Sequence, residues 1–228
     1  MLRIVDVGAE VDGIESAAVR CIGLDRAAKR NAIGVEMTLA LEDILRKTQH
    51  DSRVRVLLFH GIGGHFSAGM DMKDFFDSST RTAADMQRVR AATEHWRTRL
   101  LRAMPQAIVT AVQGSCFGGA LPILACSDVV LACRDARFGL PEINFGLVPG
   151  AQIVKAAGEC LTPRGLAHAA LTGRPFDAER ARQWGLVTEV VDGDPFEPAL
   201  ALARALVLRL PARSTSVDPG LTVTPAAT

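Results

Sequence analysis

The chain has 228 residues, of which 48% are hydrophobic and 22% charged, and its formal net charge is +1 at pH 7. A chain of this length can bury the core of one domain. Its balanced charge gives no reason to expect a nucleic acid or a membrane surface as partner.

The longest apolar stretch is interrupted by Ser127 and Asp128 and is too short to cross a bilayer. The first residues include no apolar block of the kind found in a signal peptide. Five cysteines without a CxxC pair predict reduced thiols, no metal site and a cytoplasmic protein.

Hydrophobic periodicity divides the chain into strands that alternate with helices. The expected strands are residues 17–24, 54–60, 107–112 and 128–133. The expected helices are residues 35–47, 83–103, 120–126, a segment near Ile153, and residues 163–171, 178–184 and 196–210. Because strand–helix–strand crossovers join parallel strands, the pattern predicts an α/β fold with a parallel sheet covered by helices. Residues 1–210 are expected to form one catalytic domain, and the Ser-, Thr- and Pro-rich residues 211–228 a disordered tail.

The stretch QGSCFGGALPILACSDVVLA follows an expected strand and holds Gly114, Gly118 and Gly119. Each glycine in a packed segment destabilises that segment by roughly 0.5–1 kcal/mol relative to alanine. All three glycines would be explained if the backbone had to admit a substrate carbonyl. Tight packing of a helix against a strand would explain them equally well.

A second loop, GGHFSAGMDMKDFF at residues 63–76, follows the strand expected at residues 54–60. Neighbouring parallel strands end at the same edge of a sheet, where ligands bind. Two such loops would aim free N–H groups at one oxygen, which is what the enolate of a thioester requires. The two loops therefore predict an oxyanion-binding pocket.

Glu142 lies in the segment FGLPEINFGLVPG, among Leu140, Ile143, Phe145 and Leu147. Apolar neighbours raise the pKa of a carboxyl group and suit it to acid–base catalysis. The alternative is a solvated side chain or one that caps a helix.

Four stretches, in this order, resemble the enoyl-CoA hydratase/isomerase (crotonase) superfamily: LDRAAKRNAIGVEM, VRVLLFHGIGGHFSAGMDMKDF, AIVTAVQGSCFGGALPILACSDVVLACRDARFGLPEINFGLVPG and LTGRPFDAERARQWGLVTEVV. The resemblance extends over residues 14–210. Within the superfamily, FSAGMDMKDFF, EHWRTRLL, CFGG and LPEINFG are most similar to the hydroxycinnamoyl-CoA (feruloyl-CoA) hydratase-lyases.

The resemblance implies a spiral of ββα units with covering helices and a short C-terminal helical part, assembled as a homotrimer or homohexamer. The substrate would be an acyl-CoA or an acyl-carrier-protein thioester, with coenzyme A entering only as part of the substrate and no other cofactor required. The amides of Met70 and Gly119 become the oxyanion donors, and Glu142 becomes the acid–base group. The residues expected to contact substrate are Lys29 or Arg30 near the CoA phosphates, Ala68, Asp71 and Met72 in the CoA groove, and Pro141 and Phe145 beside the acyl group. On charge alone, Lys29 and Arg30 are equally consistent with a solvated turn.

The sequence departs from the superfamily pattern at one catalytic position. Hydratases of the superfamily carry a second glutamate, and the hydratase-lyases a serine, where this chain has Pro122. The hydratase-lyases also use a tyrosine, and this chain has none. The side chains considered as replacements are His65, expected at a turn surface, Asp71, Lys73, Asp74 and Ser115, and Cys116 is expected to be a buried thiol. Lys73 is of interest because crotonase-like decarboxylases place a lysine near this position.

Three functions remain open at this stage. The first is a thioester lyase of the hydratase type with Glu142 as acid–base group. The second is an isomerase or decarboxylase that needs one such group. The third is a catalytically silent CoA-binding homologue.

Overall fold

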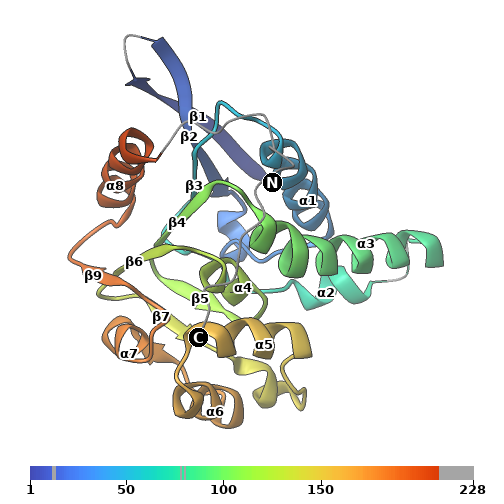
Figure 1. Ribbon diagram of the computed structural model, residues 1–228. Coiled ribbons are helices and arrows are strands. Elements are labelled where there is room, and N and C mark those ends of the chain that lie inside the picture. The colour runs from blue at the N-terminus through green and yellow to red at the C-terminus, as the bar shows by residue number, and fades with distance from the viewer. Residues whose placement is uncertain (12–13, 78, 80, 211–228) are drawn as a thin grey trace, which may run out of the picture.

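The computed structural model describes residues 1–11, 14–77, 79 and 81–210 (Figure 1). The strands are β1 (Leu2–Val11), β2 (Ile14–Leu24), β3 (Val56–Gly61), β4 (Ala107–Val112), β5 (Ser115–Phe117), β6 (Val129–Cys133), β7 (Arg137–Gly139), β8 (Phe176–Asp177) and β9 (Glu189–Val191). The α-helices are α1 (Val35–Gln49), α2 (Met72–Phe76), α3 (Ala83–His95), α4 (Leu121–Ala125), α5 (Ala151–Cys160), α6 (Pro163–Thr172), α7 (Ala178–Gln183) and α8 (Phe196–Arg209). The 3₁₀ turns are Ala27–Lys29, Leu101–Ala103, Gly118–Ala120 and Pro141–Phe145. The expected tail at 211–228 lies outside the described residues.

The described strands form two sheets. The larger sheet has the order β1-β2-β3-β4-β6-β9, in which only β1 and β2 pair antiparallel. The smaller sheet has the order β5-β7-β8, with β5 parallel to β7 and β8 antiparallel to it. The predicted parallel sheet is confirmed. The sequence did not predict β1, whose residues 3–6 are exposed, or the two- and three-residue strands, which are too short to show a period.

Strand β3 is buried on both faces, because successive side chains of a strand point to opposite sides. Val56 and Leu58 pack in the cluster that contains Ala199 and Ala203 of α8. Leu57 and Phe59 face the main core on the other side of the sheet. In Figure 1, α8 lies on one side of the large sheet. The smaller sheet and α5–α7 lie apart from α8. The loop that leaves β3 therefore starts from a rigid base.

The α-helical hydrogen bonding of α3 gives way to a π-helical turn at the carboxyl end of the helix. The helix begins with a capping box formed by Thr82 and Asp85 and ends at His95, and the chain continues as a π-helical turn over Trp96–Leu100. The sequence predicted one helix over residues 83–103, but the amide of Leu101 bonds five residues back to the Trp96 carbonyl. Such turns are rare and often mark functional sites.

The helix expected at residues 120–126 is also divided. A 3₁₀ turn over Gly118–Ala120 leads into α4, which carries Pro122 in its first turn. Proline is well accepted there, because its missing N–H would have had no partner within the helix.

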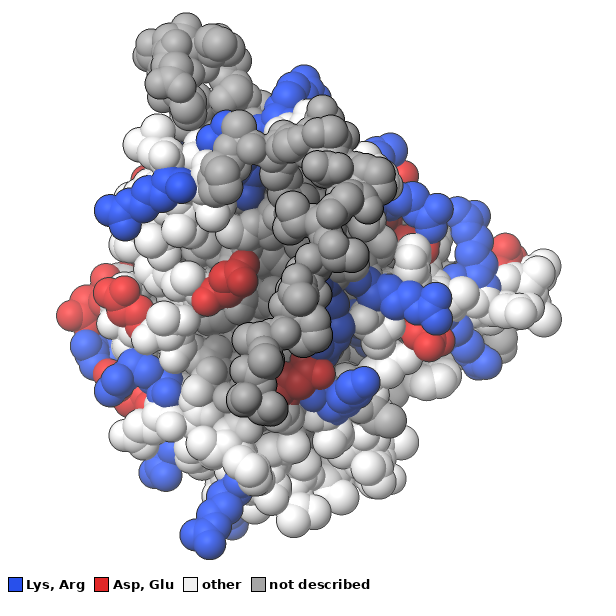
Figure 2. All heavy atoms as spheres, in the orientation of Figure 1, with Lys and Arg blue, Asp and Glu red and all other residues white. Residues whose placement is uncertain are grey.

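Charged side chains of both signs are interspersed on the face of the molecule seen in Figure 2, outside the grey atoms. Some of the charged side chains form ion pairs: Arg134 pairs with Asp192 at 2.7 Å and with Glu179 at 3.1 Å. No helix within the described residues is long and apolar enough to span a membrane. The same residues contain no group of three His, Cys, Asp or Glu side chains placed to hold a metal ion.

Candidate active site

Two loops run side by side at the carboxyl end of the large sheet. One follows β3 and the other follows β4, its parallel neighbour. The Phe66 amide donates to the Gln113 carbonyl and the Ser67 amide to the Ser115 carbonyl, both at 2.8 Å. The Phe117 amide donates to the Ser67 carbonyl at 3.1 Å. The predicted meeting of the two glycine-containing loops is therefore observed.

The side chain of Asn31 fixes the first loop through hydrogen bonds to its backbone. Its buried side chain donates to the carbonyls of Ile62 and His65 at 2.9 and 2.7 Å and accepts the Arg26 amide at 2.8 Å. Its φ of 55° is left-handed, a conformation that asparagine tolerates better than most residues. Asn31 could not be singled out from the sequence, because a polar turn does not reveal which carbonyls its asparagine reaches.

The backbone amides of Met70 and Gly119 lie close together where the loops meet. A Cβ on Gly119 would stand 3.4 Å from the Met70 nitrogen, and a Cβ on Gly69 would stand 3.4 Å from the Gly119 nitrogen. The hydrogen bonds that join the two loops use neither amide. Two adjacent N–H groups that are left out of this network are suited to binding one oxyanion.

Gly114 and Gly118 of the second loop both have a positive φ, but a side chain at each would clash with a different part of the molecule. Gly118 has a φ of +48°, and a Cβ there would stand 2.6 Å from Oε1 of Glu142. Gly114 has a φ of +56°, and a Cβ there would stand 2.2 Å from the carbonyl oxygen of Gly64. Of the two explanations left open by the sequence, Gly114 therefore fits packing, because a side chain there would push the two loops apart.

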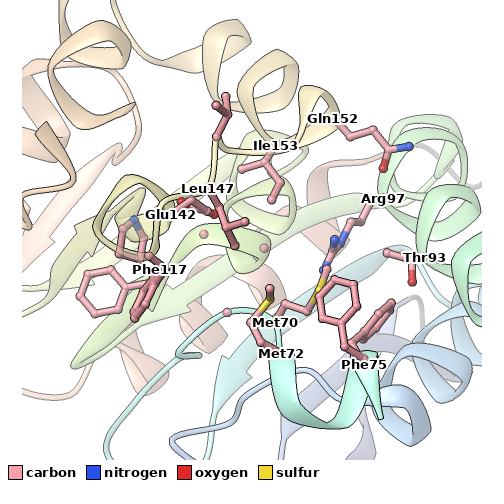
Figure 3. Close-up of a pocket in the computed structure, with 18 of the residues that line it drawn as sticks. Met70, Met72, Phe75, Thr93, Arg97, Phe117, Glu142, Leu147, Gln152 and Ile153 are labelled. Atoms are coloured by element: carbon pink, nitrogen blue, oxygen red, sulfur yellow. The ribbon is translucent and has the colours of Figure 1, made fainter. Parts of the chain in front are cut away.

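Met70 and Gly119 both line a cavity of about 1120 Å³ (Figure 3). Its walls come from both loops, from α2, from α3 with its π-helical turn, and from residues 141–153. Apolar side chains dominate the view, including Met70, Met72, Phe75, Leu147 and Ile153. The cavity is large enough for a ligand bigger than a typical drug-sized molecule.

Glu142 enters this cavity from the 3₁₀ turn Pro141–Phe145. Its Oε2 atom is buried and has no hydrogen-bond partner among the described residues. Burial raises the pKa of the carboxyl group above its usual value, because the charged form loses solvation. The alternative of a freely solvated or capping side chain does not fit these observations.

Most of the residues predicted to contact substrate line the cavity, namely Ala68, Met70, Met72, Gly119, Pro141, Glu142 and Phe145. Asp71 lies outside the lining. It caps α2 by accepting the Asp74 amide, and it pairs with Arg26 at 2.7 Å. The reason is local: a carboxylate just before a helix is drawn to the free amides of its first turn.

Lys29 and Arg30 also lie outside the lining and are exposed on a turn. The turn is nevertheless a direct neighbour of the first loop, because the Arg30 carbonyl accepts the Ala68 amide at 2.8 Å. Both side chains therefore extend from a position next to the cavity wall.

None of the side chains considered as a second acid–base group lines the cavity as the described residues define it. His65 is half-buried, and its Nδ1 accepts the Ser115 amide at 3.1 Å, so it joins the loops instead of standing at a turn surface. Asp74 bonds to the Val35 amide and pairs with Arg81, and Lys73 is exposed.

Cys116 and Pro122 are buried and also lie outside the lining. Burial raises the pKa of the Cys116 thiol far above its usual value, which agrees with the expected unreactive thiol.

Arg97 lines the cavity and was missed by the sequence-based predictions. It is 3% exposed and extends from the π-helical turn toward the loops (Figure 3). A signal existed, because Arg97 stands four residues after Thr93 and eight after Val89 on the buried face of the expected helix. A charged residue on the buried face of a helix is unusual.

Residues 14–217 match the family model described as enoyl-CoA hydratase/isomerase. Hydroxycinnamoyl-CoA hydratase-lyase of Pseudomonas fluorescens is 33% identical over 191 residues, which cover 82% of this chain and 69% of that protein. 2,3-dehydroadipyl-CoA hydratase of Escherichia coli (strain K12) is 30% identical over 198 residues, which cover 85% of this chain and 74% of that protein.

Solved structures share the fold. An enoyl-CoA hydratase/isomerase from Mycobacterium paratuberculosis superposes with a TM-score of 0.79 at 25% identity, covering 92% of this chain and 80% of its own. Pseudomonas aeruginosa AtuE superposes with a TM-score of 0.76 at 30% identity, covering 90% and 75%. The two sheets, the paired loops and these similarities lead to one conclusion: the chain belongs to the enoyl-CoA hydratase/isomerase (crotonase) family.

Proposed function

We propose that the protein is an acyl-thioester lyase of the enoyl-CoA hydratase type. The observation that carries the proposal is the position of two adjacent amides, at Met70 and Gly119, in the same apolar cavity as the Glu142 carboxyl group. Membership of a family that acts on acyl-CoA thioesters supports it. The proposal requires coenzyme A only as part of the substrate.

In the proposed reaction the thioester oxygen binds between the two amides. The Glu142 carboxylate takes a proton from a water molecule as the water oxygen bonds to the β-carbon. The electron pair of the double bond then moves onto the thioester oxygen as an enolate, which the amides of Met70 and Gly119 stabilise. The enolate re-forms the carbonyl as its α-carbon takes the proton held by Glu142, so all atoms of water are added.

The raised pKa of Glu142 suits this cycle, because a carboxylate that binds its proton more tightly is a stronger base. The carboxylate must be ionised to begin a turnover. Activity should therefore fall as the pH drops through the raised pKa, at a higher pH than an ordinary glutamate would give.

For substrate binding we propose that Lys29 and Arg30 attract the CoA phosphates, while Ala68 and Met72 contact the CoA arm. Asp71 would act on this groove through α2, the helix that it caps. Pro141 and Phe145 would contact the acyl group. Feruloyl-CoA and crotonyl-CoA are the first thioesters to assay, the former because of the similarity to a hydroxycinnamoyl-CoA hydratase-lyase.

The test is hydration of crotonyl-CoA and feruloyl-CoA by wild-type protein and by Glu142→Gln. The variant should lose roughly 10²- to 10⁴-fold in kcat, the usual contribution of a positioned acid–base group. Glu189→Gln changes an exposed glutamate on β9 and should leave kcat unaltered. Full activity of Glu142→Gln, or no turnover of any enoyl thioester by wild-type protein, would contradict the proposal.

A double-bond isomerase on the same scaffold is the second candidate. Pro122 favours it, because isomerisation needs one group that removes a proton from one carbon and returns it to another. A β,γ-enoyl thioester distinguishes the two: an isomerase converts it to the α,β-isomer faster than water is added. Decarboxylation receives less support, because Lys73 is exposed and lies outside the cavity lining. A silent CoA-binding homologue would bind thioesters with no turnover.

We also propose that the protein forms the homotrimer or homohexamer that the family resemblance implies. Phe145 and Val148, at the cavity, are 76% and 81% exposed in the single chain, and apolar side chains of this size are commonly covered in an assembly. Sedimentation equilibrium gives the mass directly, and a monomer at micromolar concentration would contradict this point.

A further inference from the structure

Arg97 is a buried cation without a counter-ion in the described structure. The residue is 3% exposed, and its Nε and Nη2 atoms are buried and have no hydrogen-bond partner among residues 1–11, 14–77, 79 and 81–210. No carboxylate among the described residues lies within 4.0 Å of its guanidinium. Its one identified electrostatic contact is the ring of Trp96, with Cζ 5.0 Å from the ring centroid.

The charge nevertheless persists at neutral pH. Burial lowers the pKa of Arg97 to about 10, which still leaves the guanidinium protonated at pH 7. A buried charge is unfavourable unless it is paired, and a methionine or leucine would fill the same space without that penalty. Within the part of the chain that the structure describes, Arg97 is therefore a cation that lacks an anion.

The position of Arg97 indicates where that anion would come from. Nη2 lies 2.8 Å from the point where a Cβ of Gly119 would stand, and the Met70 nitrogen lies 3.4 Å from the same point. The guanidinium thus adjoins the pair of amides proposed to hold the thioester oxygen. In Figure 3 the Arg97 side chain extends into the cavity from the π-helical turn after α3, and Glu142 enters from the 3₁₀ turn Pro141–Phe145.

We propose that Arg97 binds a carboxylate carried by the acyl group, so that the preferred substrates are thioesters of dicarboxylic acids. This inference rests on the proposed function, because it takes the cavity to be the site of the acyl group. A guanidinium offers paired donors that match both oxygens of a carboxylate. Arg97 is therefore a specificity-determining residue for the end of the acyl chain remote from the sulfur.

The CoA phosphates are a less suitable anion for Arg97. Arg97 is buried next to the amides of Met70 and Gly119, where the thioester carbonyl would lie. The phosphates of CoA stand at the other end of a long pantetheine arm. Exposed cations such as Lys29, Arg30 and Arg90 are better placed for groups that remain in solvent. Direct action of Arg97 on the thioester oxygen is the other alternative, and it would favour every acyl group equally.

The experiment compares thioesters whose acyl ends differ in charge but not in shape. Saturated CoA thioesters ending in a carboxylate are paired with analogues ending in an isopropyl group, at three chain lengths, so that no reaction interferes with calorimetry. At one or more lengths, wild-type protein should bind the carboxylate member roughly 10- to 100-fold more tightly, as expected for hydrogen bonds to a charged group. Equal or weaker binding of the carboxylate member in all three pairs would overturn the inference.

Variants assign the preference to Arg97. Arg97→Met should abolish it while leaving the affinity for the isopropyl member within about threefold, and Arg97→Lys should retain part of it because the charge remains. Arg99→Met removes an exposed arginine from the same π-helical turn, outside the cavity lining, and should retain the whole preference. An unchanged preference in Arg97→Met would overturn the assignment. Circular dichroism identifies a misfolded variant, in which case the wild-type pairs and Arg97→Lys decide.

Turnover separates this inference from the proposed function. The unsaturated members of the same pairs, such as a fumaryl and a 4-methylpent-2-enoyl thioester, are assayed for water addition. If the binding preference is present but no thioester reacts, the proposed function fails and the carboxylate site stands. If the isopropyl member reacts with equal or higher kcat/KM and binding shows no preference, the inference fails and the proposed function stands.

Discussion

Two walls of the cavity, the one formed by the paired loops and the one formed by α3 with its π-helical turn, use different parts of the polypeptide. The loop wall is backbone: the amides of Met70 and Gly119, held by hydrogen bonds between two loops. The helix wall is side chain, above all Arg97 on its π-helical turn. Under the proposed function the backbone wall meets the thioester oxygen that every substrate has, and the side-chain wall meets the part that differs between substrates. Reaction type and specificity are therefore expected to change independently.

The strongest test of this division perturbs the loop wall alone. In Gly69→Ala, whose φ is +91°, the new Cβ would stand 2.6 Å from the Phe117 carbonyl oxygen. The loops must separate, and misplacement by about 1 Å lowers kcat roughly 10²-fold for every acyl group. Assays with the carboxylate and isopropyl thioesters should therefore show equal losses.

Gly193→Ala is the matched control for this substitution. Gly193 also has a positive φ, +80°, but a Cβ there meets no atom within 4 Å. It should lose stability through backbone strain of about 1 kcal/mol and keep its kcat. If both alanine variants lost activity equally, strain alone would be the cause and the close approach of the loops would be irrelevant.

A substitution in the helix wall, Arg97→Met, should raise the free energy of unfolding, whereas the glycine substitutions lower activity or stability. Arg97→Met replaces a buried charge that has no partner among the described residues with an apolar side chain of similar length. Replacing buried charges with apolar side chains is often neutral or stabilises proteins by about 1–4 kcal/mol. Urea unfolding should show a higher midpoint for the variant than for wild-type protein.

The pH dependence of this gain follows from the lowered pKa of Arg97. The penalty of the charged form is present at every pH below about 10 and is relieved only as the pH rises through that value. The gain should therefore be the same at pH 6 and pH 8. A large loss of stability in Arg97→Met would mean that the guanidinium has a partner, and that its role is structural.

The loop wall could be predicted from the sequence and the helix wall could not. Glycines and small residues directly after buried strands carry a local signal, so the meeting of the two loops followed from order and spacing. Met70 and Gly119 themselves were assigned from the resemblance to the superfamily. The direction of Arg97 depends on where α3 changes to a π-helical turn, and residues 83–103 read as one regular helix. The helical period would put Arg97 on the buried face, but it offers no reason for a charge there, and Arg97 was not predicted.

The same limit applies to residues whose partners are distant in sequence. Asn31 bonds to carbonyls at Ile62 and His65, and Asp71 pairs with Arg26 across 45 positions. Asp71 was assigned to the CoA groove from its place in a motif, and the structure places it outside the cavity lining as a helix cap. A motif identifies a loop correctly but does not say which of its side chains face the ligand.

The smallest expected effect lies outside both walls, at Lys29. Lys29→Ala should raise KM for a CoA thioester about threefold, because an exposed charge next to an anionic ligand contributes less than about 1 kcal/mol. The increase should disappear with a pantetheine thioester that lacks the nucleotide phosphates. It should also disappear in high salt, which screens the attraction in wild-type protein as well.

Lys47→Ala supplies the comparison for Lys29→Ala, because Lys47 is an exposed lysine at the end of α1 whose partner is Asp43. Its loss should leave both KM values unchanged. If Lys29→Ala raised KM equally for the CoA and the pantetheine thioester, the lysine would act on the loop through the Arg30 carbonyl that holds Ala68. The turn would then belong to the loop wall, and the division between backbone and side-chain contributions would have to include it.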